Sequence, residues 1–396
     1  MRPLSAHVAA AFVAAFAAAA CGAGEIAPAA PSSITRAPAA PSQRKTIEQL
    51  VVKGLDNPWG LAFLPGGEAI VNEMPGRMRI ISKDGQISAP IANVPKVAHN
   101  GQGGLLDLQT APDFAQSQLL YFTFSEPRGG KLNSTSVGRG KLVRDAKGAR
   151  LDNVEIIFRQ NPAKVSDLHF GSRIVFAPDG SLFVTLGERA HFSDEAQDPS
   201  GDLGKVIRIM PDGKPYPGNP NKPGWAPEIW SIGHRNVQGA DLHPQTGKLW
   251  TVEHGARGGD EINIPEAGRN YGWPVISYGK NYDGSKIGEG ASKSGMEQPV
   301  YYWDPSIAPS SGIFYTGDKF PEWRGNFFVG ALKGQALHRL VLDRDKIVGE
   351  EVLFRAKNER IRNVRQGPDG YLWLVIDNPG PWGKIVRIVP APAKKS

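Results

Sequence analysis

The pairing of His169 with Glu188 is the clearest candidate for acid–base chemistry in the sequence. His169 stands just before a β-rich segment, and Glu188 follows the far end of that segment within Gly187-Glu188-Arg189. A hairpin between them would bring the imidazole and the carboxylate together, as a general base and the group that orients it. Considered alone, a histidine at such a position is more often a structural residue with its hydrogen bonds satisfied than a catalytic base.

A glycine-rich acidic region offers oxygen ligands for a metal ion. Gly233-His234-Arg235-Asn236 is followed by residues 253–263, which contain Asp260 and Glu261, and then by Asn270-Tyr271-Gly272-Trp273. Carboxylates and carbonyls on such loops suit Ca²⁺. The histidines lack zinc spacing, and the only cysteine is near the N-terminus. A solvated acidic turn closed by an aromatic corner is the alternative.

A third group of residues could hold an anion. Arg360 and Arg362 are two positions apart in a short apolar segment, so on a strand they face the same side. Lys333 supplies another cation, and Gln102 lies in the glycine-rich turn Asn100-Gly-Gln102-Gly-Gly104. Arginine forks bind carboxylates and phosphates well, although a surface edge strand explains the two arginines equally.

These residues are distributed along a chain with internal repeats. An apolar pair, a Pro, Asp or Gly turn and a β-rich run recur six times, starting near Leu61, Leu108, Ile174, Ala240, Phe320 and Val364. The spacing leaves room for a four-stranded antiparallel sheet in each unit, which must pack against its neighbours to bury both faces. The sequence therefore predicts an all-β fold, a six-bladed β-propeller of four-stranded antiparallel sheets.

The ends of the chain have a different composition. Residues 1–20 are typical of an export signal, and residues 21–45 are an Ala/Pro/Ser-rich flexible tether. Cys21 follows three alanines, as at a lipoprotein processing site, so a lipid on Cys21 is the one membrane attachment that we consider. A single propeller domain is expected over 46–390, with a basic tail over 391–396. The protein is expected to be exported or periplasmic.

Composition narrows the class of partner. The chain of 396 residues has 40% hydrophobic residues, 47 glycines and 33 prolines, which fits a folded protein rich in turns. Its net charge of +7 is spread along the sequence rather than gathered into a basic stripe with aromatics, so nucleic acid is not an expected partner. We expect convergence of a few cations on an anionic small molecule.

On these motifs the sequence resembles the soluble quinoprotein glucose dehydrogenase family, in particular its bacterial aldose sugar dehydrogenase branch. The most specific marks are Gly-His-Arg-Asn at 233–236, Gly-Gly-Asp-Glu-Ile-Asn at 258–263 and Asn-Tyr-Gly-Trp at 270–273. The resemblance covers roughly residues 50–390. It implies a six-bladed propeller that binds pyrroloquinoline quinone (PQQ) and Ca²⁺ and oxidises the anomeric hydroxyl of aldoses to a lactone.

The resemblance also implies a role for each motif residue. His169 would be the base that removes the hydroxyl proton while hydride passes to the quinone, and Glu188 would orient it where the family has Asp. The implied contacts to PQQ, a planar tricarboxylate, are Gln102, Arg235, Asn236, Lys333, Arg360 and Arg362. Trp303 or Tyr301 would supply the aromatic that stacks on the cofactor.

Two calcium sites follow from the same resemblance. Carbonyls of Gly255 and Ala256 would bind the ion that polarises the quinone, where the family has Gly-Pro preceded by Gln rather than His254. Glu261 and the carbonyl of Tyr271 resemble a second, structural site. The implied partners are an aldose and an unidentified electron acceptor, and the protein would be a monomer or a homodimer.

Two other functions remain open from the sequence. A propeller that hydrolyses lactones with a divalent ion would have no use for Lys333 or Arg362. A non-catalytic ligand-binding propeller would keep the scaffold without using His169 as a base.

Overall fold

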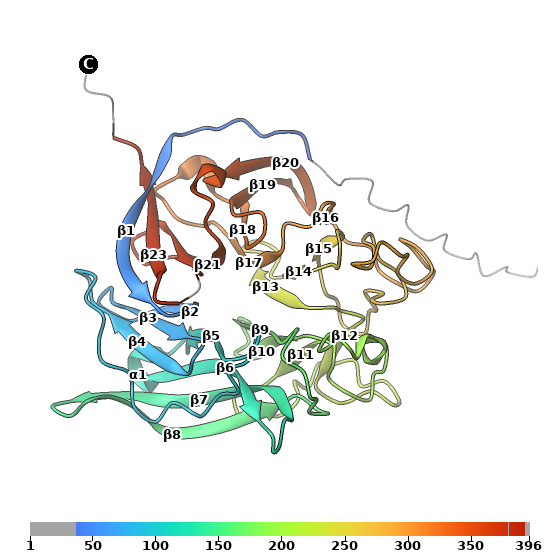
Figure 1. The fold of residues 1–396 in the computed structure, drawn as a ribbon, viewed down its shortest axis with the longest axis horizontal. Coiled ribbons are helices and arrows are strands. Elements are labelled where there is room, and N and C mark those ends of the chain that lie inside the picture. Colours follow the sequence, from blue (N-terminus) through green and yellow to red (C-terminus); the bar gives the residue numbers. More distant parts are fainter. Residues whose placement is uncertain (1–36, 379, 393–396) are drawn as a thin grey trace, which may run out of the picture.

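Six β-sheets follow one another along the chain and stand around a common axis (Figure 1). The structure is a computed structural model that describes residues 37–378 and 380–392. Neighbouring sheets touch through their first strands, which surround the axis. The predicted six-bladed β-propeller is confirmed.

The strands of the first three blades have the following bounds. The first blade contains β2 (Pro58–Phe63), β3 (Ala69–Glu73) and β4 (Arg77–Ile81). The second contains β5 (Leu105–Thr110), β6 (Leu119–Pro127), β7 (Asn133–Asp145) and β8 (Gly148–Arg159), with the short helix α1 (Phe114–Ser117) between β5 and β6. The third contains β9 (Gly171–Phe176), β10 (Leu182–Leu186), β11 (Lys205–Ile209) and β12 (Ile229–Ile232).

The other three blades complete the ring. The fourth contains β13 (Val237–Leu242), β14 (Leu249–Glu253), β15 (Asp260–Asn263) and β16 (Tyr301–Trp303). The fifth contains β17 (Pro309–Phe314), β18 (Phe327–Ala331), β19 (Leu337–Asp343) and β20 (Lys346–Leu353). The sixth contains β21 (Ile361–Gln366), β22 (Leu372–Ile376) and β23 (Gly383–Pro390), and its outermost strand is β1 (Thr46–Leu55). Short 3₁₀ turns lie at Ser193–Ala196, Pro321–Trp323 and Arg355–Lys357.

The two ends of the propeller domain close the ring together. β1 pairs antiparallel with β23 from Thr46 opposite Pro390 to Leu55 opposite Gly383. An N-terminal strand therefore completes the C-terminal blade, which covers the outer edge of β23.

The first blade departs from the predicted four strands. It has three regular strands in the described chain, and an irregular segment runs along β4 where a fourth strand would lie. There Ser88 N–H donates to Ile80 O at 2.9 Å, and Ile91 N–H donates to Met78 O at 2.8 Å. Pro90 lies between these two donors and has no N–H to give, which prevents a regular ladder.

Apolar side chains fill the spaces between neighbouring blades. One cluster joins the fourth and fifth blades, where the rings of Trp250 and Phe327 lie 5.7 Å apart and both side chains are fully buried. Each sheet thus buries both faces against its neighbours, and the first strands are left to line the central channel. We use the term site face for the end of the channel at which these six first strands begin.

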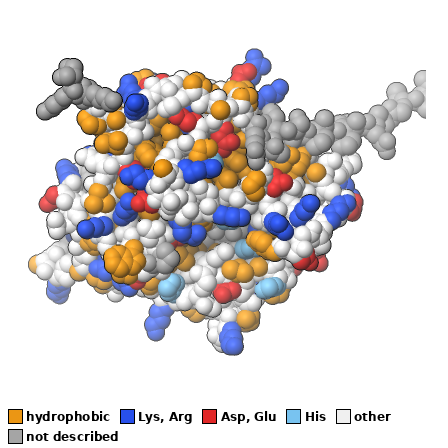
Figure 2. Space-filling model, turned by 45° about the horizontal axis from the view of Figure 1, so that its top comes forward, with side chains coloured by type: hydrophobic (Ala, Val, Ile, Leu, Met, Phe, Trp, Pro, Cys, Tyr) orange, Lys and Arg blue, Asp and Glu red, His pale blue; other side chains and the backbone are white. Residues whose placement is uncertain are grey.

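Residues 37–41 lie against the fifth blade, although the sequence analysis placed them in the flexible tether. Ala40 N–H donates to Glu350 O at 2.9 Å, and Arg339 donates to Pro41 O at 3.0 Å. The predicted export signal and Cys21 lie outside the described residues and stay predictions. Within the described chain, no helix is long and apolar enough to cross a membrane. Figure 2 shows lysines and arginines spread over the visible surface among polar and apolar groups.

Candidate active site

His169 and Glu188 meet at the site face, at the two ends of the β9–β10 hairpin. His169 Nδ1 lies 2.7 Å from Glu188 Oε2, and both side chains are buried. The backbone of His169 has φ of 50°, and a Cβ atom on Gly187 would lie only 2.0 Å from the His169 carbonyl. Only glycine at 187 permits this close approach, which fixes the imidazole beside the carboxylate. Glutamate in place of the family's aspartate therefore still reaches the ring.

Backbone hydrogen bonds attach this pair to neighbouring blades. The N–H of His169 donates to Gln102 Oε1 at 2.9 Å, and the N–H of Glu188 donates to Arg235 O at 3.0 Å. Asn236 Oδ1 accepts from Gly171 N–H at 3.0 Å. Five of the residues predicted from the sequence are thus joined across three blades.

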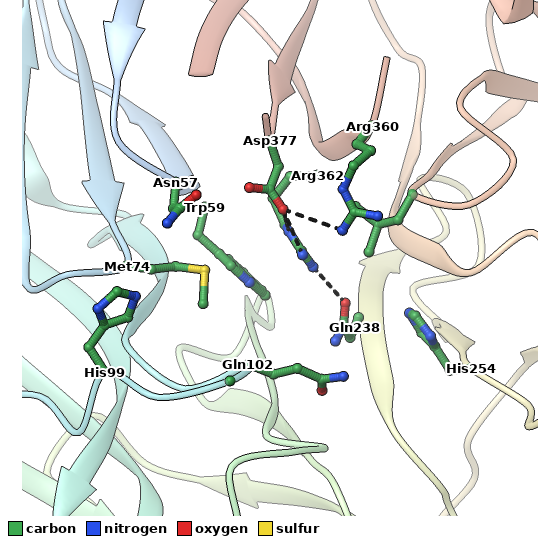
Figure 3. Close-up of a pocket in the computed structure, with 12 residues that line it drawn as sticks. Asn57, Trp59, Met74, His99, Gln102, Gln238, His254, Arg360, Arg362 and Asp377 are labelled. Atoms are coloured by element: carbon green, nitrogen blue, oxygen red, sulfur yellow. Dashed lines mark hydrogen bonds and ion pairs between the residues drawn. The ribbon is translucent and has the colours of Figure 1, made fainter. Parts of the chain in front are cut away.

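A cavity of about 280 Å³ opens at the mouth of the channel beside this group (Figure 3). Its walls come from several blades and are formed by Asn57, Trp59, Met74, His99, Gly101, Gln102, Gln238, His254, Leu332, Arg360, Arg362 and Asp377. Of the residues predicted to contact the cofactor, Gln102, Arg360 and Arg362 line it directly. Its volume is close to the lower end of the range for ligand sites.

Two predicted arginines, Arg360 just before β21 and Arg362 within it, share a single carboxylate in this cavity. Arg362 donates to Asp377 Oδ2 from Nε at 3.2 Å and from Nη2 at 2.9 Å, and to Gln238 Oε1 at 2.9 Å. Arg360 is 3.8 Å from the same carboxylate oxygen and remains partly exposed (Figure 3). Burial, and then the neighbouring charge of Arg362, lowers the pKa of Arg360. An anionic ligand would relieve this repulsion.

A second, smaller cavity adjoins the first, with His254 in the wall of both. Arg235 lines it, and its guanidinium makes one long hydrogen bond, from Nη1 to His254 O at 3.4 Å. Burial, and then the charge of Arg235, holds the pKa of His254 well below its ordinary value. His254 is therefore a neutral imidazole between cationic side chains.

Several unsatisfied polar atoms belong to this region. Of the fourteen buried side-chain atoms without a hydrogen-bond partner in the described chain, three belong to residues that line the smaller cavity, and two belong to the predicted motifs beside it: Arg235 Nε, His254 Nε2 and Trp273 Nε1, with Asn236 Nδ2 and Asn263 Oδ1. Buried polar groups are nearly always paired, and exceptions commonly mark a missing ligand or ion. The donors and the surplus of arginine over Asp377 fit a flat polycarboxylate such as PQQ.

The smaller cavity also fits a cation. Glu253 and Glu261 are both in its wall, and neither makes an ion pair with a lysine or arginine of the described residues. Burial, and then the charge of Glu253, raises the pKa of Glu261 to about 8. Gly255 and Tyr271 line the same cavity, and Ala256 is buried next in the chain. The four predicted calcium ligands are thus brought to one region, where a divalent ion would offset the two carboxylates.

Two predicted cofactor contacts have other surroundings. Trp303 was expected to stack on the cofactor, but its ring packs against Tyr301 in the core between the fourth and fifth blades, and its Nε1 donates to Glu350 at 3.0 Å. The structure contradicts this prediction, because β16 is the outermost strand of its blade and Trp303 is buried in that core, in the wall of neither cavity. Lys333 is exposed beside Leu332, and its ammonium makes no hydrogen bond or ion pair with the described residues.

Several residues of the cavity were not predicted from the sequence, although two regularities point to them. The second residue of every first strand occupies the same place around the axis: Trp59, Leu106, Ser172, Gln238, Ser310 and Arg362. Acidic residues also recur where the second strand of a blade ends: Glu73, Glu188, Glu253 and Asp377. Aligning the six units by strand position would therefore have selected Trp59, Gln238 and Asp377.

Comparisons with known proteins agree with this geometry. Residues 55–387 match the family described as Glucose / Sorbosone dehydrogenase. The chain is 41% identical over 341 residues to aldose sugar dehydrogenase YliI of Escherichia coli, covering 85% of this chain and 91% of the relative. The crystal structure of the soluble aldose sugar dehydrogenase from Escherichia coli in the apo-form is 39% identical with a TM-score of 0.84, covering 88% of this chain and all of that one.

A solved structure with bound cofactor is also similar. The PQQ-bound form of aldose sugar dehydrogenase from Streptomyces coelicolor is 29% identical, with a TM-score of 0.74. The match covers 89% of this chain and 99% of that chain. The similarity therefore extends over the whole propeller rather than over single motifs.

Proposed function

The chain belongs to the glucose/sorbosone dehydrogenase family, and on that premise we propose that it oxidises the anomeric hydroxyl of aldoses to a lactone with PQQ and Ca²⁺. One observation carries the proposal: a histidine–carboxylate pair stands beside a cationic cavity whose buried polar atoms lack partners. The imidazole suits proton removal, and the cavity suits an anionic redox group.

The cationic residues would hold the cofactor by its carboxylates. Arg362 is already held in place by Asp377 and Gln238, so it can offer its charge without reorganisation. Arg235 and Arg360 have N–H donors without a partner. Lys333 directly follows Leu332, which lines the cavity, so its long side chain would extend to the rim. When bound, PQQ supplies the acceptor for the two electrons and the hydrogen that leave C1 of the sugar.

His169 would take the proton from the sugar. Glu188 accepts the hydrogen bond from His169 Nδ1, which leaves Nε2 with a lone pair for the proton of the anomeric hydroxyl. As the O–H bond breaks, that proton passes to Nε2, and the buried carboxylate stabilises the imidazolium. The same carboxylate keeps the ring in one orientation between turnovers.

Calcium would be bound by carbonyls of Gly255 and Ala256 and, at a second site, by Glu261 and the carbonyl of Tyr271. The buried pair of Glu253 and Glu261 supports this assignment, since two carboxylates without a cation are costly at this depth. Ca²⁺ would supply positive charge at this position, and it prefers oxygen ligands of the kind that these carbonyls and carboxylates offer.

Reconstitution of the purified protein tests the proposal. With PQQ and Ca²⁺ we expect a higher melting temperature and reduction of a dye by glucose. His169→Ala should retain the shift in melting temperature but lose about 10²- to 10⁴-fold in turnover, as for removal of a general base. His191→Ala, an exposed histidine on the same face, is the matched control and should oxidise glucose normally.

The results separate the alternatives. Absence of both the thermal shift and dye reduction would reject the dehydrogenase. Binding of PQQ without turnover by the wild-type protein would instead favour a non-catalytic binding propeller.

A further inference from the structure

A buried arginine next to the His169–Glu188 pair has no counter-ion. Arg189 directly follows Glu188, its side chain is fully buried, and it makes no ion pair with a carboxylate of the described residues. Burial lowers the pKa of Arg189 to about 10, with the charges of Glu188 and Asp167 acting in the opposite direction, so the guanidinium is charged at neutral pH. A buried charge is costly unless its donors are met, so the groups that accept from Arg189 indicate its role.

The guanidinium of Arg189 binds the segment that leads into His169. Its Nε donates to Leu168 O at 2.9 Å, and its Nη2 donates to Ser166 O at 2.6 Å. The ring of Phe170 packs against the guanidinium, with its centroid 3.8 Å from Cζ. Arg189 therefore contacts both of the residues that flank His169 in the chain.

The same side chain ties this segment to the second blade. Nη2 of Arg189 also donates to Asn133 Oδ1 at 2.6 Å, at the start of β7. Asn133 Nδ2 donates in turn to Ser166 O at 2.9 Å, and Ser166 Oγ donates to Arg189 O at 2.9 Å. Arg189, Asn133 and Ser166 thus form a closed set of hydrogen bonds on one side of the base.

The backbone at this corner is strained on both sides of the β9–β10 hairpin. His169 has φ of 50°, and Arg189 and Ala190 have φ of 67° and 64°. Residues other than glycine rarely occupy this region, and such strain persists only where the surroundings fix it. Gln102 holds one side of the segment, because its N–H donates to Asp167 O at 2.7 Å and its Oε1 accepts from His169 N–H. The donors of Arg189 hold the other side.

We propose that Arg189 is a positioning residue for the general base, whose planar guanidinium fixes residues 166–170 so that the His169 imidazole is held against Glu188 in the orientation needed for proton removal. The inference rests on the proposed role of His169. A planar fork can bind two carbonyls and an amide at once, whereas the ammonium of lysine is a point charge on a flexible chain. Because a general base acts only from the right position, displacement of the ring lowers turnover without weakening the binding of sugar or cofactor.

Arg189→Lys in the holoenzyme tests the proposal, since it keeps the positive charge but loses the fork. We expect kcat for glucose to fall by about 10- to 100-fold, with the KM for glucose and the affinity for PQQ unchanged. Arg128→Lys is the matched control, an exposed arginine in the β6–β7 turn that donates to Ser134 Oγ, and it should oxidise glucose normally. A lower melting temperature with wild-type kcat in Arg189→Lys would show a merely structural role and overturn the inference.

A second variant keeps the test decisive if Arg189→Lys does not fold. Asn133→Ala removes one acceptor of the guanidinium and leaves the two carbonyls in place. It should show the same pattern, a lower kcat with an unchanged KM for glucose, but a smaller loss. An unchanged kcat in a folded Asn133→Ala variant also counts against the proposal.

A measurement without turnover separates this inference from the proposed function. In proton NMR spectra of the cofactor-free protein, the Nδ1–H proton shared between His169 and Glu188 should give a downfield signal, identified by its absence in His169→Ala. This signal should shift or disappear in Arg189→Lys and stay in place in Arg128→Lys. If it moves while the wild-type protein oxidises no aldose, the positioning role stands and only the dehydrogenase is rejected. A signal that is unchanged in Arg189→Lys overturns the inference, whatever the turnover.

Discussion

Two buried arginines near the axis have opposite surroundings. Arg173, deeper in the channel, donates to Asp107 Oδ1 at 2.8 Å, to Gln238 O at 2.9 Å and to Ser310 O at 3.0 Å. Arg235, at the site face, has one long hydrogen bond and an Nε atom without a partner. Both side chains are buried, yet only the guanidinium of Arg173 has its hydrogen bonds met by other groups of the protein; we call its surroundings the saturated site and those of Arg235 the unsaturated site.

The difference distinguishes a buried arginine that stabilises the fold from one whose donors are available to bind a ligand. Asp107 also accepts from Arg365 at 2.9 Å, so Arg173 belongs to a network that joins five blades across the axis. Among the described residues, the guanidinium of Arg235 has only the ring of Trp273, whose centroid lies 5.1 Å from Cζ, and a backbone carbonyl. Partial satisfaction of a buried charge costs stability in the free protein and becomes favourable once an anion binds.

The largest effect is expected from breaking the saturated site. Arg173→Met removes one of the two arginines that donate to Asp107 and leaves two carbonyls without this donor, so we expect a loss of about 3–5 kcal/mol in the free energy of unfolding, as for other buried pairs. Urea unfolding of the cofactor-free protein measures it. Arg139→Met removes a surface pair with Glu155 and should cost less than about 1 kcal/mol. Equal losses in the two variants would contradict the comparison.

Features that lie within one blade are the ones that the sequence predicts. The recurring turns predict six blades because each turn joins the first two strands of a unit, and His169 and Glu188 are found because they flank one hairpin. Pro90 signals the irregular edge of the first blade only once β4 is located.

Residues that meet from different blades are harder to predict. Gln238 and Asp377 are 139 positions apart in the chain and are joined only through Arg362. Trp303 shows the limit most clearly, because an aromatic residue in a strand looks the same whether that strand is the first or the fourth in its blade. Sequence patterns fix the period of the strands, whereas distance from the axis depends on the order of strands within each sheet.

Breaking the unsaturated site should have a smaller effect and a different readout. Arg235→Met removes a charge that the protein leaves largely unpaired, so we expect the cofactor-free protein to keep its stability within about 1 kcal/mol. The affinity for PQQ should fall by about 30- to 1000-fold, the cost of losing one desolvated charge contact. Calorimetric titration with PQQ in the presence of Ca²⁺ measures this.

The opposite result for Arg235→Met would remove the distinction between the two arginines. If the variant unfolds as readily as Arg173→Met and binds PQQ normally, then Arg235 is a structural residue. Arg344→Met provides the control for loss of a positive charge, since Arg344 lies in the exposed β19–β20 turn.

The smallest effect is expected at Glu188, whose hydrogen-bond partner His169 belongs to the same site. Glu188→Gln keeps the size of the side chain and an oxygen that can accept from His169 Nδ1, but it removes the negative charge beside the imidazolium. Turnover should fall by about 10- to 100-fold, as for loss of a supporting carboxylate, while the KM for glucose and the affinity for PQQ stay unchanged. A merely structural role would instead lower the melting temperature and leave the turnover of the folded variant unchanged, and Glu155→Gln, a surface carboxylate, should alter neither.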